Sequence, residues 1–409
     1  MQSGQVLGRN GANMRRPRAE KGLFGKRWLE TFGLDPTVLH VNHGSFGAVP
    51  EPVRNRQRSI QDEVRADPSR FFRSEYRGRL RKAAGSVAEF LGGAPEDWVF
   101  VENATSAANS VISSLRLESG DTILFTNQAY GAVRKAVLYW CDRTGAKPVE
   151  ASVSPPLSDP EQVTAAVVSA MRGRTRLVVL DHVASACGIV FPIFELCRHF
   201  RERDIPVLVD GAHAPGNLDL DVPSIGADFY IANAHKWLCA PLGSGVLWCR
   251  RSRQERMRPT AISHGYGSGF SRAFDWTGTR DPSAWLSVPA AIEFHNSVGG
   301  GLLRRRNRAV ANKAAQRLAS QFGTELSAPE DMHCSMASVR LAEHGYATEL
   351  DTERLQLLVA ASESVSVSLA RLGGSLWLRL SAAIYNEIDD LVEAGHRVSR
   401  VLGELHGRR

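Results

Sequence analysis

The sequence predicts an α/β fold in which crossover helices connect the strands of a mostly parallel sheet. From Trp98 onward, short apolar runs alternate with longer segments of helical pattern. Between Asp181 and Val207, apolar residues at helical spacing stop at Pro206 before the next apolar run, which predicts a β-α-β unit. The 409 residues, 43% apolar and 23% charged, are typical of a globular enzyme or binding protein of two or three domains.

The first 27 residues are expected to form a disordered, solvated tail. They carry seven basic side chains against a single acid, Glu20, and contain no apolar segment of a secretory signal. A mitochondrial presequence is the alternative interpretation of this composition. The tail supplies most of the formal net charge of +7, so the remaining chain is nearly neutral. A nearly neutral body argues against a nucleic-acid groove.

The remaining chain is expected to form three parts. Residues 28–90 form an N-terminal segment whose Arg-rich stretch 51–91 reads as helices. Residues 91–288 form the large domain, with strands predicted at WVFVE, TILFT, RLVVLD, PVLVD, DFYIA and GVLWC. Residues 289–409 form a smaller α+β domain with a helix over 301–322 and weaker strands around 333–342 and 375–381.

Cysteine and lysine usage limits the chemistry further. The six cysteines include no C-x-x-C pair and no zinc spacing, so we expect reduced thiols, no metal site and a cytoplasmic location. The sequence contains no run of 18 apolar residues, so it predicts no membrane span. Only seven of the 50 basic residues are lysines, which leaves few candidates for chemistry that needs an amine.

Polar residues gather after three of the predicted strands. Open parallel sheets bind ligands at the carboxyl ends of their strands. The segment ENATSAAN (102–109) opens a helix, so the free N–H groups near Thr105 and Ser106 are suited to a phosphate, with plain helix capping as the alternative. The other two segments are VLVDGAHAPG (207–216) and ANAHKWLCAPLGSG (232–245).

Asp210 and Lys236 are the strongest catalytic candidates in these segments. Asp210 ends an apolar strand, where its carboxylate needs a cationic or N–H partner such as a pyridinium nitrogen. Lys236 lies between His235 and Trp237, a setting that lowers the pKa of an amine and suits a covalent link to a carbonyl group. A structural ion pair between the two residues is the alternative.

Five motifs in order resemble the class V aminotransferase family, which has fold type I and uses pyridoxal 5'-phosphate (PLP). Within it they are similar to the isopenicillin N epimerase-like branch. The motifs are LHVNHGSFGAVP (39–50), DGAHAPG, NAHKW, WTGTRDPSAW (276–285) and WLRLSAAIYNEIDD (377–390). The resemblance implies a PLP-dependent enzyme acting on a small-molecule substrate, an amino acid or amino-acid conjugate, in a homodimer, with no nucleic acid or membrane partner.

The resemblance also implies roles for individual residues. Lys236 would carry the cofactor covalently, Asp210 would hold the protonated pyridine nitrogen, and His213 would lie near the phenolic oxygen; these three are the expected catalytic residues. A protonated ring withdraws electrons from the substrate α-carbon, so Asp210 keeps that proton in place. Further cofactor-binding positions are Thr105, Ser106, Gln128, Tyr130, Ser185, Asn233, His235 and Thr279.

Thr279 and Arg379 match positions that serve the complete active site. Thr279 matches a residue that reaches the phosphate of the neighbouring subunit. Arg379 matches the arginine that binds the substrate α-carboxylate, for which its planar guanidinium is suited. The loop 42–47 resembles one that folds over the site, and the expected substrate-binding residues beside Arg379 are Asn42, Gly44, Ser45 and His264.

The chain departs from the family where many relatives carry a histidine that stacks on the cofactor ring. It reads TNQAYGA there, with Gln128 at the histidine position. Tyr130 is the candidate to cover the ring instead, and simple core packing is the alternative.

Several reactions remain open because PLP labilises any of three bonds to the α-carbon. An epimerase needs a second acid, for which Tyr130 and His264 are candidates. A C–S β-lyase needs only Lys236, and a decarboxylating or oxidative reaction, or transamination, is also open. Cysteine desulfurase is disfavoured because 343–378 contains no cysteine. A non-catalytic binding protein is disfavoured by the retained motifs, and the branch suggests bacterial specialised metabolism such as antibiotic biosynthesis.

Overall fold

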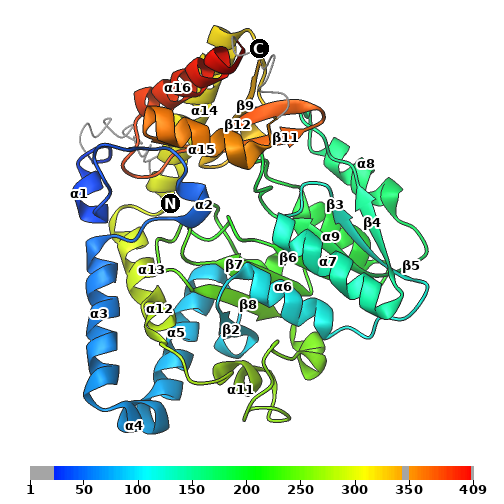
Figure 1. Cartoon of the computed structure of the whole chain (residues 1–409). Helices are drawn as coiled ribbons and strands as arrows, with labels where there is room; N and C mark the ends of the chain where they lie inside the picture. The colour runs from blue at the N-terminus through cyan, green and yellow to red at the C-terminus, as the bar shows by residue number, and fades with distance from the viewer. Residues whose placement is uncertain (1–22, 343–349, 407–409) are drawn as a thin grey trace, which may run out of the picture.

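A seven-stranded sheet forms the centre of the computed structural model, which describes residues 23–342 and 350–406 (Figure 1). Most of the predicted tail therefore lies outside the described residues. The strand order is β2-β8-β7-β6-β5-β3-β4, and only β8 runs opposite to the others. The strands are β2 (Trp98–Val101), β3 (Asp121–Thr126), β4 (Lys147–Ala151), β5 (Arg174–Asp181), β6 (Val207–Asp210), β7 (Phe229–Asn233) and β8 (Gly245–Cys249).

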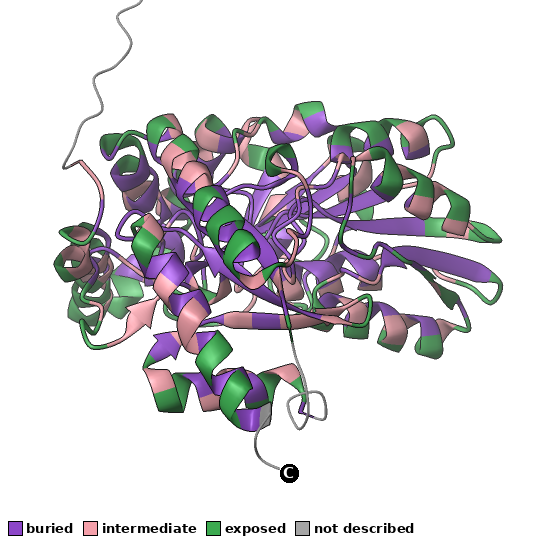
Figure 2. Cartoon of the chain, turned by 90° about the horizontal axis from the view of Figure 1, so that it is seen from above, coloured by how far each residue is buried: buried purple, intermediate pink, exposed green. Residues whose placement is uncertain are grey.

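The sheet includes all six strands expected from the sequence and one more, β4. Five of the strands are buried along their whole length, as their nearly continuous apolar runs require, and Figure 2 shows the sheet as a buried layer between helices. The unexpected β4 is an edge strand with exposed Lys147, Pro148 and Glu150. Its polar sequence carries no strand signal, and an edge position tolerates its proline.

Helices cover both faces of this sheet. Successive strand residues alternate between two cores: Leu124 packs toward α5, α8, α9 and α13, whereas Phe125 packs toward α6, α7 and α11. The helical segments here are α6 (Ala104–Ser113), α7 (Gly131–Thr144), α8 (Glu161–Ala170), α9 (Ile193–Arg201), α10 (Val222–Ile225), η3 (Arg251–Arg256), α11 (Phe270–Asp275), α12 (Ser283–Leu286) and α13 (Val288–Ser297).

The N-terminal segment links the sheet to the C-terminal part of the chain. Strand β1 pairs in parallel with β10, and Asn42 bridges to Ser381, so the loop 42–47 is held beside the C-terminal sheet. Gly47, at φ 76°, could not carry a Cβ without meeting the His235 carbonyl oxygen. The elements are α1 (Trp28–Phe32), β1 (Leu39–His40), α2 (His43–Phe46), α3 (Glu51–Ala66), α4 (Pro68–Arg70), the π-helical η1 (Phe71–Glu75), α5 (Tyr76–Leu91) and η2 (Pro95–Asp97).

The C-terminal part packs two long helices on a small antiparallel sheet of order β11-β12-β9 (Figure 1). The expected helix over 301–322 and strands near 333–342 and 375–381 are all present. The elements are α14 (Gly301–Phe322), η4 (Glu330–Met332), β9 (Met336–Leu341), α15 (Thr352–Glu363), β10 (Val365–Ser366), β11 (Ser368–Leu372), β12 (Ser375–Ser381) and α16 (Ile388–His406). In the described ranges, no helix is both long and apolar enough to cross a membrane. The boundaries 28–90, 91–288 and 289–409 remain our proposed division.

Candidate active site

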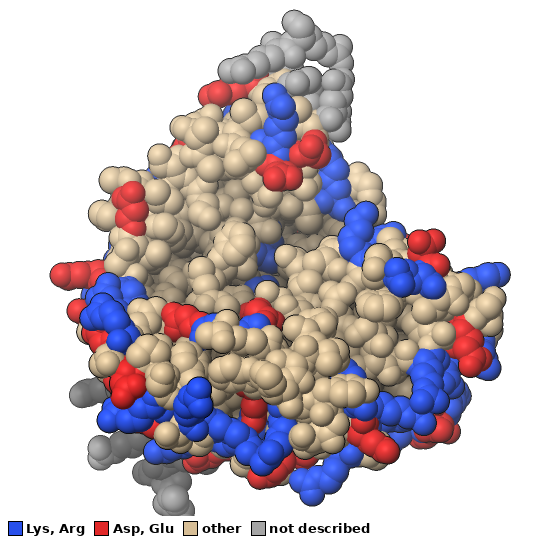
Figure 3. Space-filling model, turned by 60° about the horizontal axis from the view of Figure 1, so that its bottom comes forward, with Lys and Arg blue, Asp and Glu red and all other residues tan. Residues whose placement is uncertain are grey.

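A pocket of about 720 Å³ lies at the carboxyl ends of β5, β6 and β7. Its other walls come from the loop 42–47, from the start of α6 and from strands β11 and β12 of the C-terminal sheet. The space-filling view shows the surface hollowed between the C-terminal part and the larger body of the molecule (Figure 3). The pocket therefore lies at the strand ends where the sequence predicts ligand binding.

Lys236 lies at the floor of this pocket, three residues after β7, and is only 7% exposed. Burial, together with the positive charge of Arg379, lowers the pKa of its amine to about 8, although the carboxylate of Asp210 acts in the opposite direction. Lys236 forms no ion pair with any described residue. A substantial fraction of the amine is therefore neutral near pH 7 to 8 and available as a nucleophile or a base.

His213 lies between Lys236 and the C-terminal side of the pocket. Its Nε2 is 3.1 Å from the Lys236 Nζ and 3.2 Å from the Ser185 Oγ. Its Nδ1 accepts a hydrogen bond from the indole N–H of Trp237 at 3.3 Å. Burial and the charges of Lys236 and Arg379 lower the His213 pKa well below its usual range. His213 is therefore a neutral imidazole whose ring orientation is fixed on three sides.

Asp210 has a second buried carboxylate, Asp181, as its neighbour. The two residues are paired in register at the ends of β6 and β5. Asp210 accepts a hydrogen bond from the Ala212 N–H at 3.0 Å, and Asp181 accepts one from the Thr126 hydroxyl at 3.5 Å. Burial raises the pKa of each, and for Asp181 the charge of Asp210 raises it further. Such a pair retains a proton more readily than a lone carboxylate.

Asp181 was not among the expected site residues. The available signal was its position, because it ends the run RLVVLD as Asp210 ends PVLVD. Parallel pairing places the two strand ends at the same edge of the sheet.

The start of α6 forms one wall of the pocket. The Asn103 side chain caps the helix by accepting from the Ser106 N–H at 2.9 Å, and the Asn233 side chain accepts from the Ala104 N–H at the same distance. Asn233 thereby attaches β7 to the helix start. Thr105 lines the pocket, whereas Ser106 does not and its N–H is already bonded. An anion bound here would meet Thr105 and the positive end of the helix dipole.

His235 adds a polar group with no partner to this wall. Its Nδ1 is buried without a hydrogen-bond partner among the described residues. Burial and the charge of Lys236 lower its pKa to about 4, so the ring is neutral. A buried, unpaired ring nitrogen is costly unless a ligand satisfies it.

Arg379 reaches the pocket from β12 and is held by three residues of two other segments. Its guanidinium donates to the Asn42 side-chain oxygen at 2.8 Å, to the Ser45 hydroxyl at 3.1 Å and to the Ser185 carbonyl oxygen. Its Nε is buried without a partner among the described residues. Burial lowers the pKa to about 10, so the group stays charged. It lines the pocket and forms no ion pair with a carboxylate of the described residues, which suits the binding of a carboxylate ligand.

Gln128 and Tyr130 line the pocket from the segment between β3 and α7. Gln128 is buried and fixed, donating to the Val153 carbonyl oxygen at 2.6 Å and accepting from the Cys187 thiol at 3.4 Å. Tyr130, at the start of α7, is half exposed at the pocket mouth, and its ring centre lies 5.8 Å from the Lys236 Nζ. Both residues line the pocket, Gln128 as a fixed buried group and Tyr130 as an exposed one.

The structure leaves several expected residues outside the pocket lining. Gly44 packs below the site, where an added Cβ would lie 2.8 Å from the Met336 sulfur. Asn42 acts behind Arg379 rather than in the lining. His264 and Thr279 are exposed and do not line the pocket of this chain. Their assigned roles in substrate and phosphate binding remain predictions.

His43 is a second residue that the sequence reasoning missed. Its Nε2 donates to the Lys236 carbonyl oxygen at 3.0 Å, and its Nδ1 accepts from the Tyr385 hydroxyl at 2.9 Å. Burial lowers its pKa to about 4. His43 thus joins the N-terminal loop, the backbone of the central lysine and the C-terminal part in one hydrogen-bond chain.

Comparisons with known proteins agree with this arrangement. The family model Aminotransferase class-V matches residues 70–393. Isopenicillin N epimerase of Streptomyces clavuligerus is 37% identical, and the alignment covers 90% of this chain and 97% of that protein. A probable chloroplastic L-cysteine desulfhydrase of Arabidopsis thaliana is 31% identical, and the alignment covers 87% of this chain and 81% of that protein. The cystine C–S lyase C-DES, solved with its product cysteine persulfide, superposes with a TM-score of 0.76 at 19% identity, covering 89% and 98%.

Fold and site together define a PLP-dependent enzyme of fold type I. The chain belongs to the class V aminotransferase family.

The residues of the pocket fit PLP. The buried amine of Lys236 would carry the covalent link, and the buried carboxylate of Asp210 would meet the ring nitrogen. The unpaired ring nitrogen of His235 and the start of α6 at Thr105 suit a phosphate. When bound, PLP withdraws electrons from the substrate α-carbon and so labilises its bonds.

Proposed function

We propose that this enzyme inverts the α-carbon of an amino acid or amino-acid conjugate, in the manner of its epimerase relatives. The observation that carries the proposal is that two proton-transfer groups, Lys236 and Tyr130, face the same pocket near Arg379. Inversion requires removal of a proton on one face of the carbon and delivery on the other. Of the two candidates for the second group, Tyr130 lines the pocket and His264 does not.

Arg379 and Lys236 define how the substrate is held. The guanidinium would bind the substrate α-carboxylate, and Lys236 would hold the cofactor in the same pocket. Asn42, Ser45 and Ser185 fix the guanidinium, so the orientation of the carboxylate is set before the substrate arrives. The Lys236 amine, whose pKa burial lowers to about 8, would accept the α-proton.

The apolar residues at the mouth of the pocket favour a substrate with a large side chain. Phe46 and Leu242 line it and are 74% and 64% exposed, and Tyr130 lies at the same opening. A side chain extending from the α-carbon would leave the polar floor and pass these apolar groups. The 37% identity to isopenicillin N epimerase agrees with a conjugated rather than a small amino acid.

Cleavage of a C–S bond in an S-conjugated cysteine is the second candidate. The relatives described as L-cysteine desulfhydrases favour it, and the reaction needs Lys236 but no second proton donor on the other face. The pocket has no cysteine among its described lining residues, which disfavours a desulfurase that carries sulfur on a thiol. A decarboxylating or oxidative reaction remains a third outcome of the test below.

We also propose a homodimer that operates in the cytoplasm, in bacterial specialised metabolism. Thr279 is exposed at a turn beyond the pocket of its own chain. The next residue, Arg280, pairs with Glu102, which does line the pocket. The turn therefore lies beside the site and is accessible to a second copy.

One incubation separates the reactions. The holoenzyme is given amino acids, amino-acid conjugates and S-conjugated cysteines in deuterated water, and deuterium entry, configuration, pyruvate and carbon dioxide are followed. Inversion with one deuterium at the α-carbon supports the proposal. Pyruvate release without inversion supports the lyase, and carbon dioxide the decarboxylating reaction.

Two variants sharpen this experiment. Lys236→Ala should stop deuterium entry, inversion, pyruvate release and carbon dioxide release alike. Tyr130→Phe should stop inversion while α-deuterium exchange with retention continues, because only one face loses its proton donor. A Tyr130→Phe enzyme that inverts its substrate at the native rate would overturn the proposed role of Tyr130.

A further inference from the structure

A second pocket, of about 350 Å³, lies at the opposite end of the same strands. Its walls are the segment after α6, the starts of β5 and β7, the loop before β6, and η3. Arg176 of this pocket and Asp181 of the active site are five residues apart on β5. A strand rises about 3.3 Å per residue, which puts them about 17 Å apart. The two pockets are separate sites.

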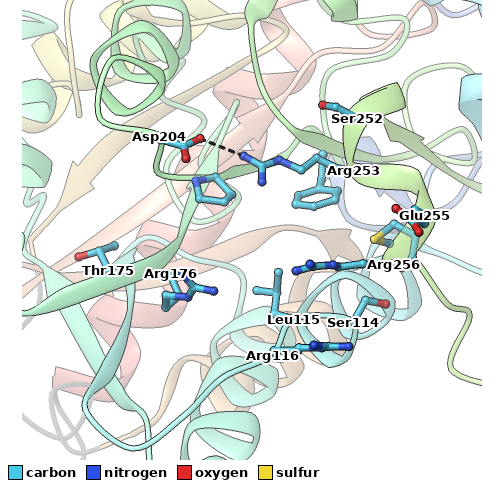
Figure 4. Close-up of a pocket in the computed structure, with 13 residues that line it drawn as sticks. Ser114, Leu115, Arg116, Thr175, Arg176, Asp204, Ser252, Arg253, Glu255 and Arg256 are labelled. Carbon is cyan, nitrogen blue, oxygen red and sulfur yellow. Dashed lines mark ion pairs between the residues drawn. The ribbon is translucent and has the colours of Figure 1, made fainter.

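The rim of this second pocket is rich in arginine. Four arginines line it with two acids; the full set of charged residues is Arg116, Arg176, Arg253, Arg256, Asp204 and Glu255. Arg253 is held by Asp228 at 2.9 Å and faces Asp204 at 3.6 Å, and Arg176 lies 3.9 Å from Asp121. The side chains of Arg116 and Arg256 form no ion pair or hydrogen bond with any described residue. Figure 4 shows Arg116, Arg176 and Arg256 around one hollow, with Arg253 turned toward Asp204.

The floor of the pocket is apolar. It is formed by Leu115, Pro206, Phe229 and Met257, of which Phe229 and Met257 are almost fully buried. The volume is at the lower end of the range of about 300–1,000 Å³ that small-molecule pockets occupy. Free guanidinium groups above an apolar floor suit a ligand with an anionic end and a flat, apolar body.

We propose that this pocket binds a small organic phosphate with a flat ring, of the class of nucleoside phosphates. The guanidinium groups of Arg116 and Arg256 bind the phosphate oxygens, because a planar guanidinium matches phosphate with two parallel hydrogen bonds. The ring lies against Leu115 and Met257. The active-site pocket takes no part, so such a ligand and the amino-acid substrate bind together.

Calorimetry on the holoenzyme, freed of excess cofactor, tests this proposal with four probes. These are ADP, adenosine, tripolyphosphate and citrate, at physiological salt. ADP should bind with a Kd below about 1 mM, and each of the other three at least about tenfold more weakly. If tripolyphosphate binds as tightly as ADP, the apolar floor contributes nothing to binding, and the proposed contact with the ring is wrong. No ADP binding at about 5 mM would overturn the proposal outright.

A charge-matched pair of variants identifies the residues. The double variant Arg116→Gln/Arg256→Gln should weaken ADP binding at least about tenfold. The control Arg58→Gln/Arg305→Gln removes two exposed arginines that line neither pocket. Equal weakening in both would show only a general attraction to a basic surface and would contradict the proposed site. Unchanged cofactor absorbance and unfolding temperature establish that both variants are folded.

Discussion

The indole N–H of Trp237 donates a hydrogen bond to the Nδ1 of His213 across 3.3 Å. An indole nitrogen can only donate, so this Nδ1 carries no proton, and the neutral ring carries its proton on Nε2. That Nε2 is 3.1 Å from the Lys236 Nζ. An ammonium group cannot accept a hydrogen bond, whereas a neutral amine can. The contact therefore favours the neutral form of Lys236, in the same direction as its burial.

The first prediction concerns the pH at which the apoenzyme captures PLP. Attack on the aldehyde requires the neutral amine, whose fraction rises as pH increases toward the Lys236 pKa of about 8. The capture rate should rise about tenfold per pH unit below this value and level off above it. Rapid-mixing absorbance from pH 6 to 10.5, at constant ionic strength, measures the midpoint. A rate still climbing at pH 10 would show an unperturbed amine.

The second prediction tests the role of Trp237. In Trp237→Phe the ring nitrogen loses its donor, so His213 can move its proton to Nδ1 and accept from an ammonium. The capture midpoint should shift upward by about half to one pH unit. Trp377→Phe is the matched control, because this buried indole donates to a backbone carbonyl oxygen in the C-terminal sheet. An identical midpoint in Trp237→Phe and the wild type would exclude the tautomer effect.

Sequence reasoning recovered the elements whose pattern is strong and local. The six apolar strands, the helix over 301–322 and the pocket at the strand ends were all predicted. Strand β4 was missed because Lys147, Pro148 and Glu150 give no apolar pattern, and its strand conformation depends on pairing with β3.

The site residues that were missed depend on contacts distant in sequence. Asp181 becomes a site residue only through its pairing with Asp210, and His43 through a carbonyl oxygen 193 residues away. The contact of His43 leaves no spacing pattern in one sequence, whereas the position of Asp181 at a strand end was a signal that was not used. Thr279 shows the converse, because its motif WTGTRDPSAW is local, whereas its proposed role depends on a second copy of the chain.

The third prediction separates the two buried carboxylates. Asp210→Asn should keep the cofactor but slow turnover about 100-fold or more, because an amide cannot hold the ring proton electrostatically. This corresponds to several kcal/mol in the activation barrier. Asp181→Asn removes the same charge one strand away and should cost less than about tenfold. Turnover and cofactor absorbance are measured for both. Equal losses would show that Asp210 acts only through the shared charge.

The fourth prediction tests shared sites in a dimer. Lys236→Ala and Thr279→Val are each expected to be inactive or nearly so, and mixing them should restore activity through hybrid dimers that contain one intact site. Thr277→Val, in the same turn, serves as the control partner. The readouts are turnover after subunit exchange and mass by light scattering. A monomer at working concentration would refute the shared site.

The last prediction concerns how the substrate carboxylate is bound. Arg379 is held by Asn42, Ser45 and Ser185, with its charge directed into the pocket. A lysine there would lose the paired hydrogen bonds of the planar group. Arg379→Lys should therefore lower kcat/KM, by an amount that corresponds to about 2 to 5 kcal/mol of activation free energy. Esterifying the substrate carboxylate should cost the wild type a similar amount. The ester should then add little to the loss in the variant, because both changes remove one interaction. Four kcat/KM values, for two enzymes and two substrates, complete the cycle, and fully additive losses would mean that Arg379 binds another group.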